Sequence, residues 1–151
     1  MAKAGKHGEP VELDVGGRSV RVSNPGKPYF PEVGLSKLDV VTYFAMVAPT
    51  MLNVLRERPT TLERWPSGVV EGVVLSTRDG AKGDAFYQKR VPQGAPSYVE
   101  TVTIAFPSGR TADGVCPTEP AVIAWAGNLG TITFHPWPVR SANHDGPDEL
   151  R

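Results

Sequence analysis

Apolar and polar residues alternate in several short runs along this chain, and helical spacing replaces that alternation in two places. The alternation around Gly16-Gly17 predicts a β-hairpin over residues 11–22, because glycine supplies the positive φ of a tight turn. Further strands are predicted over residues 60–65, 69–77, 84–90, 98–106, 110–116 and 131–135. The pattern predicts an α+β fold, in which two or three helices pack on a mainly antiparallel sheet.

The first helix is predicted over residues 37–48. Apolar residues recur there at helical spacing, and those expected to face the core are Leu38, Val41, Phe44, Ala45 and Ala48. Ser36 is a suitable N-cap, and Asp39 three residues later makes a near capping box. Pro49 is expected to kink or restart the helix, which would then continue over residues 50–56.

A second, shorter helix is predicted over residues 119–128. Thr118 is the expected cap, and Pro120 lies in the first turn, where a missing N–H costs little. The helix is expected to stop near Gly130.

The composition fits one globular domain of 151 residues with a formal net charge of zero. Residues 1–90 carry a net charge of +3 and residues 91–151 one of −3, so a polyanion should prefer the N-terminal half. Cys116 is the single cysteine, which excludes a disulfide within the chain and fits a reducing cytoplasm.

Three regions are expected along the chain. Residues 1–10 form a disordered tail, residues 11–140 the folded module, and residues 141–151 a polar tail. Residues 1–10 lack the apolar segment of a signal peptide, and no apolar run approaches the roughly 20 residues that cross a bilayer. We therefore expect a cytoplasmic protein with no membrane partner.

The first candidate site is the stretch SNPGKPYFPEVGLSK, residues 23–37. It places Asn24 and Lys27 in a proline-rich turn and Lys37 at the start of the first helix. A helix N-terminus has unpaired N–H groups and the positive end of the dipole, so these three residues would make a phosphate pocket. The alternative interpretation is a solvated turn that leads into a capped helix.

The second candidate site combines aromatic and cationic residues of two predicted strands. Phe86 and Tyr87 precede Lys89, and Arg64 and Trp65 would extend the same surface. An exposed aromatic ring beside a cation is a platform for a nucleobase. The alternative is a half-buried strand with one aromatic ring inward and the cations solvated.

His135 is the third candidate, since a neutral imidazole can hydrogen-bond a phosphate or sugar; the alternative is a structural histidine at a strand end. No Cys/His cluster has metal-ligand spacing, and no phosphate-binding P-loop or nucleophile elbow is present. The carboxylates Asp145, Asp148 and Glu149 lie in the polar tail, which does not hold them rigidly enough for two-metal chemistry. The sequence therefore predicts no catalytic or metal-binding residue.

Several motifs, in order along the chain, resemble the polymerase domain of bacterial DNA ligase D and its stand-alone relatives. These are primase-polymerases of the archaeo-eukaryotic primase superfamily, used in end joining. The motifs are SNPGKPYFPEVGLSKLDVVTYF, RERPTTLERWPSG, AFYQKRVPQGAPSYVETVTIAFPSGRTADGVC, NLGTITFHPWPVR and HDGPDELR. The resemblance runs from about residue 11 to residue 151 and covers roughly the N-terminal half of such a domain.

The resemblance implies a role for each candidate residue. Asn24, Lys27 and Lys37 would bind the 5′-phosphate of a recessed DNA end. Phe86 and Tyr87 would stack on the template or gap, with Arg64 near the same DNA path. His135 would lie close to the incoming nucleotide or its metal site.

Three departures from the family pattern stand out. Glu63 replaces a basic residue that relatives can carry before the Arg-Trp pair, and residues 70–82 look like an insertion. Relatives also follow Pro-Asp-Glu-Leu-Arg with a strand carrying Asp-x-Asp, whose carboxylates, with a third Asp, bind two divalent metal ions. These 151 residues stop short of that strand, so Mg²⁺ or Mn²⁺ is expected only for the complete domain.

The leading hypothesis is a nucleic-acid-binding module, the DNA-end-recognising half of a nucleotidyltransferase for DNA repair, inactive alone. Its partners would be gapped or recessed DNA with a 5′-phosphate, Ku-like or ligase proteins, and a second copy through an exposed sheet edge. One alternative is a protein-interaction module without DNA affinity. Another is half of a split polymerase, completed in trans. The expected location is the cytoplasm, in association with the nucleoid.

Overall fold

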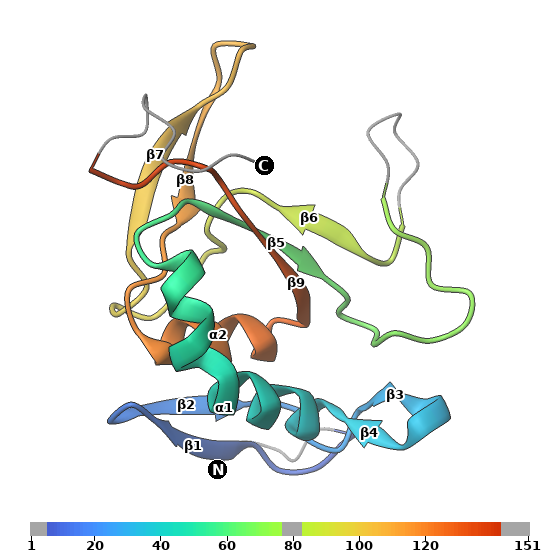
Figure 1. The fold of residues 1–151 in the computed structure, drawn as a ribbon. Coiled ribbons are helices and arrows are strands. Elements are labelled where there is room, and N and C mark those ends of the chain that lie inside the picture. Colours follow the sequence, from blue (N-terminus) through green and yellow to red (C-terminus); the bar gives the residue numbers. More distant parts are fainter. Residues whose placement is uncertain (1–5, 77–82, 143–151) are drawn as a thin grey trace.

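The computed structural model describes residues 6–76 and 83–142, which form a mixed α+β fold (Figure 1). The strands β1 (Val11–Val15) and β2 (Arg18–Val22) pair antiparallel around Gly16-Gly17, as the alternation predicts. Figure 1 shows this hairpin on one side of the two helices and the main sheet on the other. The polar segment that precedes β1 contacts the rest of the fold, because the carbonyl of His7 accepts a hydrogen bond from Gly26 N at 2.9 Å.

A second, very short hairpin leads into the first helix and was not predicted from the sequence. Its strands are β3 (Pro28–Phe30) and β4 (Leu35–Ser36), and the 3₁₀ helix η1 (Pro31–Val33) joins them. Gly34 ends η1 at φ 73°, in the left-handed region.

The first helix, α1 (Lys37–Leu55), begins as predicted with Ser36 as N-cap and Asp39 completing the capping box. The predicted continuation of the helix beyond Pro49 is confirmed, but as one helix that runs through Pro49 to Leu55, so a restart at that residue is wrong. Pro49 removes one helical hydrogen bond, but the buried side chains before and after it keep both halves on the same core.

The expectation that no segment is long and apolar enough to cross a membrane is also corrected. Among the described residues, α1 meets that criterion by length and composition, with 19 residues and a mean hydropathy of 1.5. One face of α1 packs on α2 (Pro120–Asn128) and on the core, while Tyr43, Met46 and Val54 of α1 remain exposed.

The five-stranded main sheet is built around β5 (Thr60–Arg64). On one edge β5 pairs with β9 (Thr131–Pro136), and on the other with β6 (Phe86–Gln88). The hairpin of β7 (Thr101–Ala105) and β8 (Thr111–Val115) joins the β6 side, where Thr60 pairs with Val115. Every one of these pairings is antiparallel, as expected for the α+β class.

Two local predictions fail. The strand predicted over residues 69–77 does not form in its described part, which contains a single bridge from Leu75 to Ala85. The N-cap of α2 is Glu119 and not Thr118, and its side chain makes no capping hydrogen bond. Pro120 occupies the first turn, as predicted, so one of the N–H groups that a cap would satisfy is absent.

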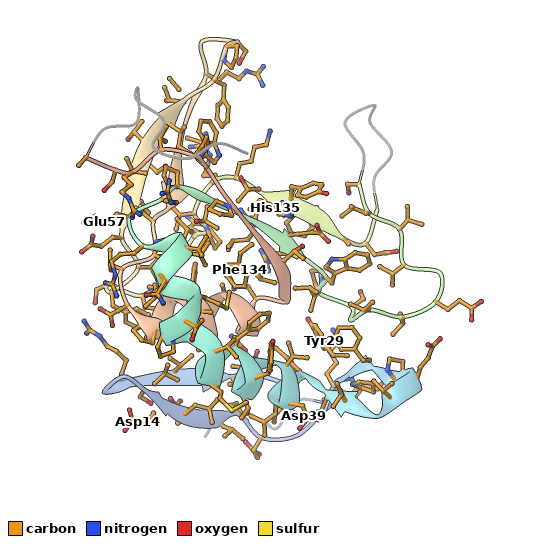
Figure 2. The ribbon with its side chains drawn as sticks, viewed as in Figure 1. Asp14, Tyr29, Asp39, Glu57, Phe134 and His135 are labelled. Atoms are coloured by element: carbon orange, nitrogen blue, oxygen red, sulfur yellow. The ribbon has the colours of Figure 1, made fainter. Side chains whose placement is uncertain are left out.

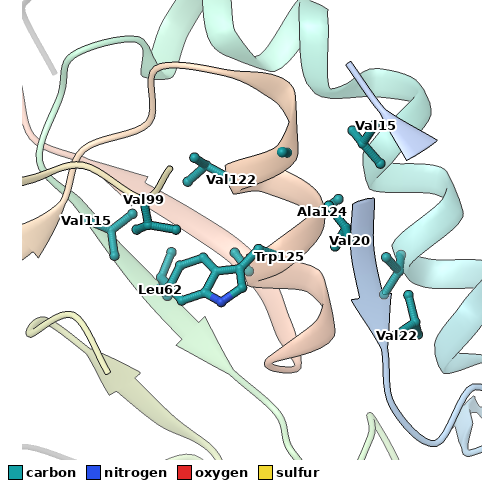
Figure 3. Packing of buried hydrophobic residues seen from close by; sticks show 12 residues of the cluster. Val15, Val20, Val22, Leu62, Val99, Val115, Val122, Ala124 and Trp125 are labelled. Atoms are coloured by element: carbon teal, nitrogen blue, oxygen red, sulfur yellow. The ribbon is translucent and has the colours of Figure 1, made fainter. Parts of the chain in front are cut away.

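The core surrounds α2, in which residues 121–127 are all buried. One side of α2 meets Val20 and Val22 of the first hairpin, and the other meets Leu62 and Val115 of the sheet (Figure 3). A second cluster joins α1 to α2 and to the second hairpin through Tyr29, Phe44, Ala48, Leu52 and Ile123. The N-terminus of α1 and the C-terminal end of β5 are thus fixed to one core.

Candidate nucleic-acid interface

The loop of residues 23–27 is held in one conformation against α2. Asn24 adopts a left-handed φ of 49°, and its carbonyl accepts a hydrogen bond from Lys27 N at 3.0 Å. Asn128, at the end of α2, accepts a hydrogen bond from Ser23 N at 2.9 Å. Lys27 and Asn24 are therefore presented by an ordered turn.

The backbone N–H groups at the start of α1 are already used. Lys37 N donates to the Lys27 carbonyl at 2.8 Å, Leu38 N to the Pro25 carbonyl at 3.0 Å, and Asp39 N to Ser36 Oγ at 3.2 Å. The expectation of unpaired N–H groups for an anion is therefore corrected. Any affinity of this end of α1 for phosphate must come mainly from side-chain charges.

Lys37 is the most buried of these charges, with 6% of its surface exposed. Its Nζ donates to Ser23 Oγ at 3.1 Å, a neutral partner. Burial lowers the pKa of Lys37 to about 8, and the positive charges of Lys27 and Arg64 act in the same direction. Three cations thus lie near one another, and we call Lys27, Lys37 and Arg64 the cationic cluster.

Each cation of the cluster is held by neutral oxygens. Lys27 Nζ donates to the carbonyl of Pro66. Arg64 donates from Nε to the Leu129 carbonyl at 2.9 Å and from Nη1 to Gln88 Oε1 at 2.9 Å. Within residues 6–76 and 83–142, no carboxylate forms an ion pair with the cluster, so its charge is not neutralised.

Tyr29 lies beside the cationic cluster and is 1% exposed. Burial raises the pKa of Tyr29 to about 12, although the nearby charge of Arg64 opposes this shift. The backbone of Gly130 passes so close that a Cβ built there would lie 2.6 Å from the Tyr29 hydroxyl oxygen. Trp65 N donates to the Gly130 carbonyl at 2.7 Å, which ties the end of β5 to the same point.

The register of β5 and β6 divides the predicted aromatic platform between two faces of the sheet. Arg64 lies opposite Phe86, and its guanidinium carbon is 5.1 Å from the centre of that ring. Tyr87 lies opposite Glu63 on the other face, where it is 44% exposed. Phe86 therefore belongs with the cationic cluster, and Tyr87 does not.

His135 lies with Tyr87 on this second face, which we call the outer face of the sheet (Figure 2). The two rings meet edge to face, with centroids 5.5 Å apart. His135 Nε2 is 3.2 Å from Glu63 Oε2, and Trp65 Nε1 donates to Glu63 Oε1 at 2.8 Å. The indole N–H of Trp65 is thus already used by Glu63.

Glu63 is the acidic centre of the outer face. Burial alone would raise the pKa of Glu63, but hydrogen bonds from Trp65, Thr133 and His135 outweigh it and lower the pKa. A carboxylate charge therefore lies where the resemblance suggested a basic residue. Lys89, the remaining predicted residue, lies with its Nζ 5.4 Å from the centre of the Phe106 ring, at the turn that joins β7 to β8.

Three residues of this arrangement were not singled out from the sequence: Tyr29, Gln88 and Asn128. Gln88 accepts a hydrogen bond from Arg64, and Asn128 accepts one from Ser23. In both pairs the partners are far apart in the sequence. No local pattern marks such partners. Tyr29 carried a signal, because it lies inside the motif already noted.

Divalent metal ions find no site in the part of the chain that the structure describes. No group of three or more His, Cys, Asp or Glu residues there could hold such an ion. Glu63 and His135 supply only two donors. The described residues alone therefore do not supply the ligands of a two-metal centre.

Comparison with known proteins adds independent information. Residues 36–151 match the family described as "LigD, primase-polymerase domain". The chain is 31% identical over 116 residues to "Multifunctional non-homologous end joining protein LigD" of Mycolicibacterium smegmatis, covering 77% of this chain and 14% of that protein. It is 30% identical over 132 residues to the protein of the same name from Pseudomonas aeruginosa, covering 87% and 14%. The chain thus spans about one seventh of these relatives.

The fold is also similar to a solved structure described as the polymerase domain from Mycobacterium tuberculosis ligase D in complex with DNA. The TM-score is 0.66 at 29% identity, and the match covers 79% of this chain and 37% of that one. The similarity agrees with the α+β architecture inferred from the sequence.

Proposed function

The chain belongs to the LigD primase-polymerase domain family, and from this we propose that it is the DNA-end-binding part of an end-joining polymerase. Its place in a family of end-joining DNA repair proteins is supported by both the family match and the relatives. The proposal adds that the ligand is the 5′-phosphate of a gapped or recessed DNA end. The observation that carries it is the cationic cluster of Lys27, Lys37 and Arg64.

Uncompensated charge is the first argument for a phosphate ligand. The described residues place three cations together with no carboxylate partner, and hold them with neutral oxygens. Burial and the neighbouring cations make the charged form of Lys37 costly, as its lowered pKa shows. A phosphate would relieve that cost, because it supplies the opposite charge and accepts hydrogen bonds.

Loop order is the second argument. Asn24 and Lys27 lie on a turn whose backbone is held by the Lys27–Asn24 hydrogen bond and by the bond from Ser23 N to Asn128, so this backbone loses little conformational freedom when a ligand binds. A terminal phosphate carries more negative charge than a phosphate within the strand, so it gains more from several cations than an internal phosphate does. We therefore propose that Asn24, Lys27 and Lys37 recognise the end, and that Arg64 contacts the adjacent strand.

The aromatic residues receive different roles. Phe86 is covered by the guanidinium of Arg64, so we propose that it supports this cation and that Tyr87, which is exposed, stacks on a base. His135, which contacts Tyr87, would then lie near the incoming nucleotide. Nucleotidyl transfer with Mg²⁺ or Mn²⁺ is assigned to a complete polymerase domain, and no described residue is given a catalytic step.

The proposal is tested by fluorescence anisotropy with a gapped duplex that carries either a 5′-phosphate or a 5′-hydroxyl at the recess. The phosphorylated end should bind at least tenfold tighter, and affinity should fall by about 0.9 log units per decade of salt for each phosphate contact. Lys27→Ala should abolish the preference, whereas Lys89→Ala, a cation outside the cluster, should leave it intact. Equal binding of both ends would refute the proposal.

A further inference from the structure

The hydroxyl group of Tyr29 lies beside the cationic cluster, and nothing in the fold makes use of it. Tyr29 is 1% exposed, and its ring packs in the core with Phe44 and Leu52. Its pKa responds to burial and to the charge of Arg64, but to no hydrogen-bonding group. Within residues 6–76 and 83–142, no hydrogen bond involves this hydroxyl. A buried tyrosine hydroxyl usually has a partner, and a phenylalanine would fill the same core space without one.

The hydroxyl is not sealed inside the protein. In the part of the chain that the structure describes, Thr131 Oγ1 is the single buried side-chain nitrogen or oxygen that has neither solvent contact nor a hydrogen bond. The Tyr29 hydroxyl has no hydrogen bond either, so the small exposed part of Tyr29 includes its hydroxyl oxygen. A ligand bound at the surface can therefore reach it.

Backbone contacts place this hydroxyl next to the anchors of two cations of the cluster. A Cβ built at Gly130 would lie 2.6 Å from the Tyr29 hydroxyl oxygen and 3.1 Å from the Trp65 carbonyl oxygen. Arg64 Nε donates to the carbonyl of the residue before Gly130, at 2.9 Å. Lys27 Nζ donates to the carbonyl of the residue after Trp65. The hydroxyl and both cations are therefore held around the same two backbone segments.

The hydroxyl is also held in place before a ligand binds. Val69 N donates to the Tyr29 carbonyl at 2.8 Å, and Figure 2 shows Tyr29 between the second hairpin and the main sheet. Burial raises the pKa of Tyr29 to about 12, so the phenol keeps its proton at neutral pH and can donate it. The side chains of the cationic cluster carry hydrogen-bond donors only, so none of them can accept this proton.

We propose that Tyr29 is a specificity-determining residue of the phosphate site, and that its hydroxyl donates a hydrogen bond to an oxygen of the bound 5′-phosphate. The assignment rests on the proposed function and deepens it, because it adds a neutral donor to the three cations. A terminal phosphate supplies charged acceptor oxygens, whereas a 5′-hydroxyl end has none. Tyr29 should therefore raise the preference for the phosphorylated end more than the general affinity for DNA.

The test uses Tyr29→Phe, which removes the hydroxyl and keeps the ring. Tyr43→Phe is the matched control, since Tyr43 is 55% exposed on α1 and lies outside the cationic cluster. Fluorescence anisotropy with a gapped duplex measures binding of the 5′-phosphate and 5′-hydroxyl ends, and urea unfolding is followed for each protein. Tyr29→Phe should bind the phosphorylated end about tenfold more weakly and the 5′-hydroxyl end as the wild type does. Tyr43→Phe should change neither.

Stability separates this role from a structural one. The unfolding midpoint of Tyr29→Phe should not fall, because the free protein loses no hydrogen bond with the hydroxyl. A wild-type preference for the phosphorylated end that persists in Tyr29→Phe would overturn the inference and leave the proposed function standing. A lower midpoint with equal loss of affinity for both ends would overturn it as well and give the hydroxyl a structural role. Equal binding of both ends by the wild type would refute the proposed function, and the assignment of Tyr29 with it.

Discussion

Lys37 at the start of α1 and Arg64 at the end of β5 lie close enough that the charge of Arg64 contributes to lowering the pKa of Lys37. Two elements from separate parts of the chain therefore bring like charges together, with Lys27 as a third. Such an arrangement costs folding free energy, and it is typical of sites whose ligand supplies the missing charge.

The first prediction concerns stability and pH. The pKa of Lys37 is lowered from 10.5 to about 8, so the unfolded chain binds more protons than the folded one between these values. The free energy of unfolding should therefore rise with pH from about 8 to 10.5, by roughly 3 kcal/mol at most. Urea unfolding across this range should show the rise in wild type but not in Lys37→Met. A parallel rise in both proteins would contradict the assignment.

The second prediction concerns DNA and pH. Lys37 loses its charge in the free protein as the pH rises past about 8, so affinity for a 5′-phosphorylated end should fall between pH 7 and pH 9. Affinity for the 5′-hydroxyl end should change much less. Anisotropy titrations at constant ionic strength check this, and a preference that is flat over this range would count against Lys37 as a phosphate contact.

The third prediction concerns Glu63, which places a negative charge beside Tyr87 and His135. Glu63→Lys should tighten DNA binding regardless of the 5′-phosphate, because it removes repulsion on the outer face and adds attraction. The same change should lower stability by about 1–3 kcal/mol, since the indole N–H of Trp65 loses its acceptor. Weaker binding of both DNA ends would show that Glu63 itself contacts the ligand.

The fourth prediction concerns the backbone of Gly130, which has φ 89° and where a Cβ would lie 2.6 Å from the Tyr29 hydroxyl oxygen. Gly17 has a similar φ of 85°, but a Cβ there would meet nothing within 4 Å. Both Gly→Ala changes carry the cost of a left-handed alanine, about 1–2 kcal/mol. Gly130→Ala should cost about 1–3 kcal/mol more in chemical denaturation, through the clash alone. Equal losses would show that Tyr29 and Trp65 move aside freely.

Local signals in the sequence predicted much of the scaffold. Gly16-Gly17 fixed the place of the first hairpin, and Ser36 with Asp39 predicted the start of α1 to the residue. The strand predicted over residues 69–77 failed because its apolar residues lie in a loop and find no continuous partner strand. Pro49 did not break α1, because packing on both sides outweighed local propensity.

The site was predictable as a set of residues but not as an arrangement. Lys27 and Lys37 stand out in one motif, yet the link to Arg64 depends on how β5 meets α1. We expected the first N–H groups of α1 to be available to a phosphate. In the structure, Lys37 N and Leu38 N instead donate to the carbonyls of Lys27 and Pro25. Phe86 and Tyr87 lie on opposite faces of the sheet, as neighbours on a strand must. The sequence did not reveal which of the two rings shares a face with Arg64.

The most direct test of the cationic cluster is a thermodynamic cycle between Lys37→Met and the removal of the 5′-phosphate from a gapped duplex. Four dissociation constants, measured by anisotropy at one salt concentration, give the coupling energy between the side chain and the phosphate. If the 5′-phosphate binds at the cluster, the coupling should be at least about 1.4 kcal/mol, a tenfold effect, and Lys89→Met should show no coupling. If Lys37→Met weakened both DNA ends equally, the coupling would be zero and the 5′-phosphate would not bind at this cluster.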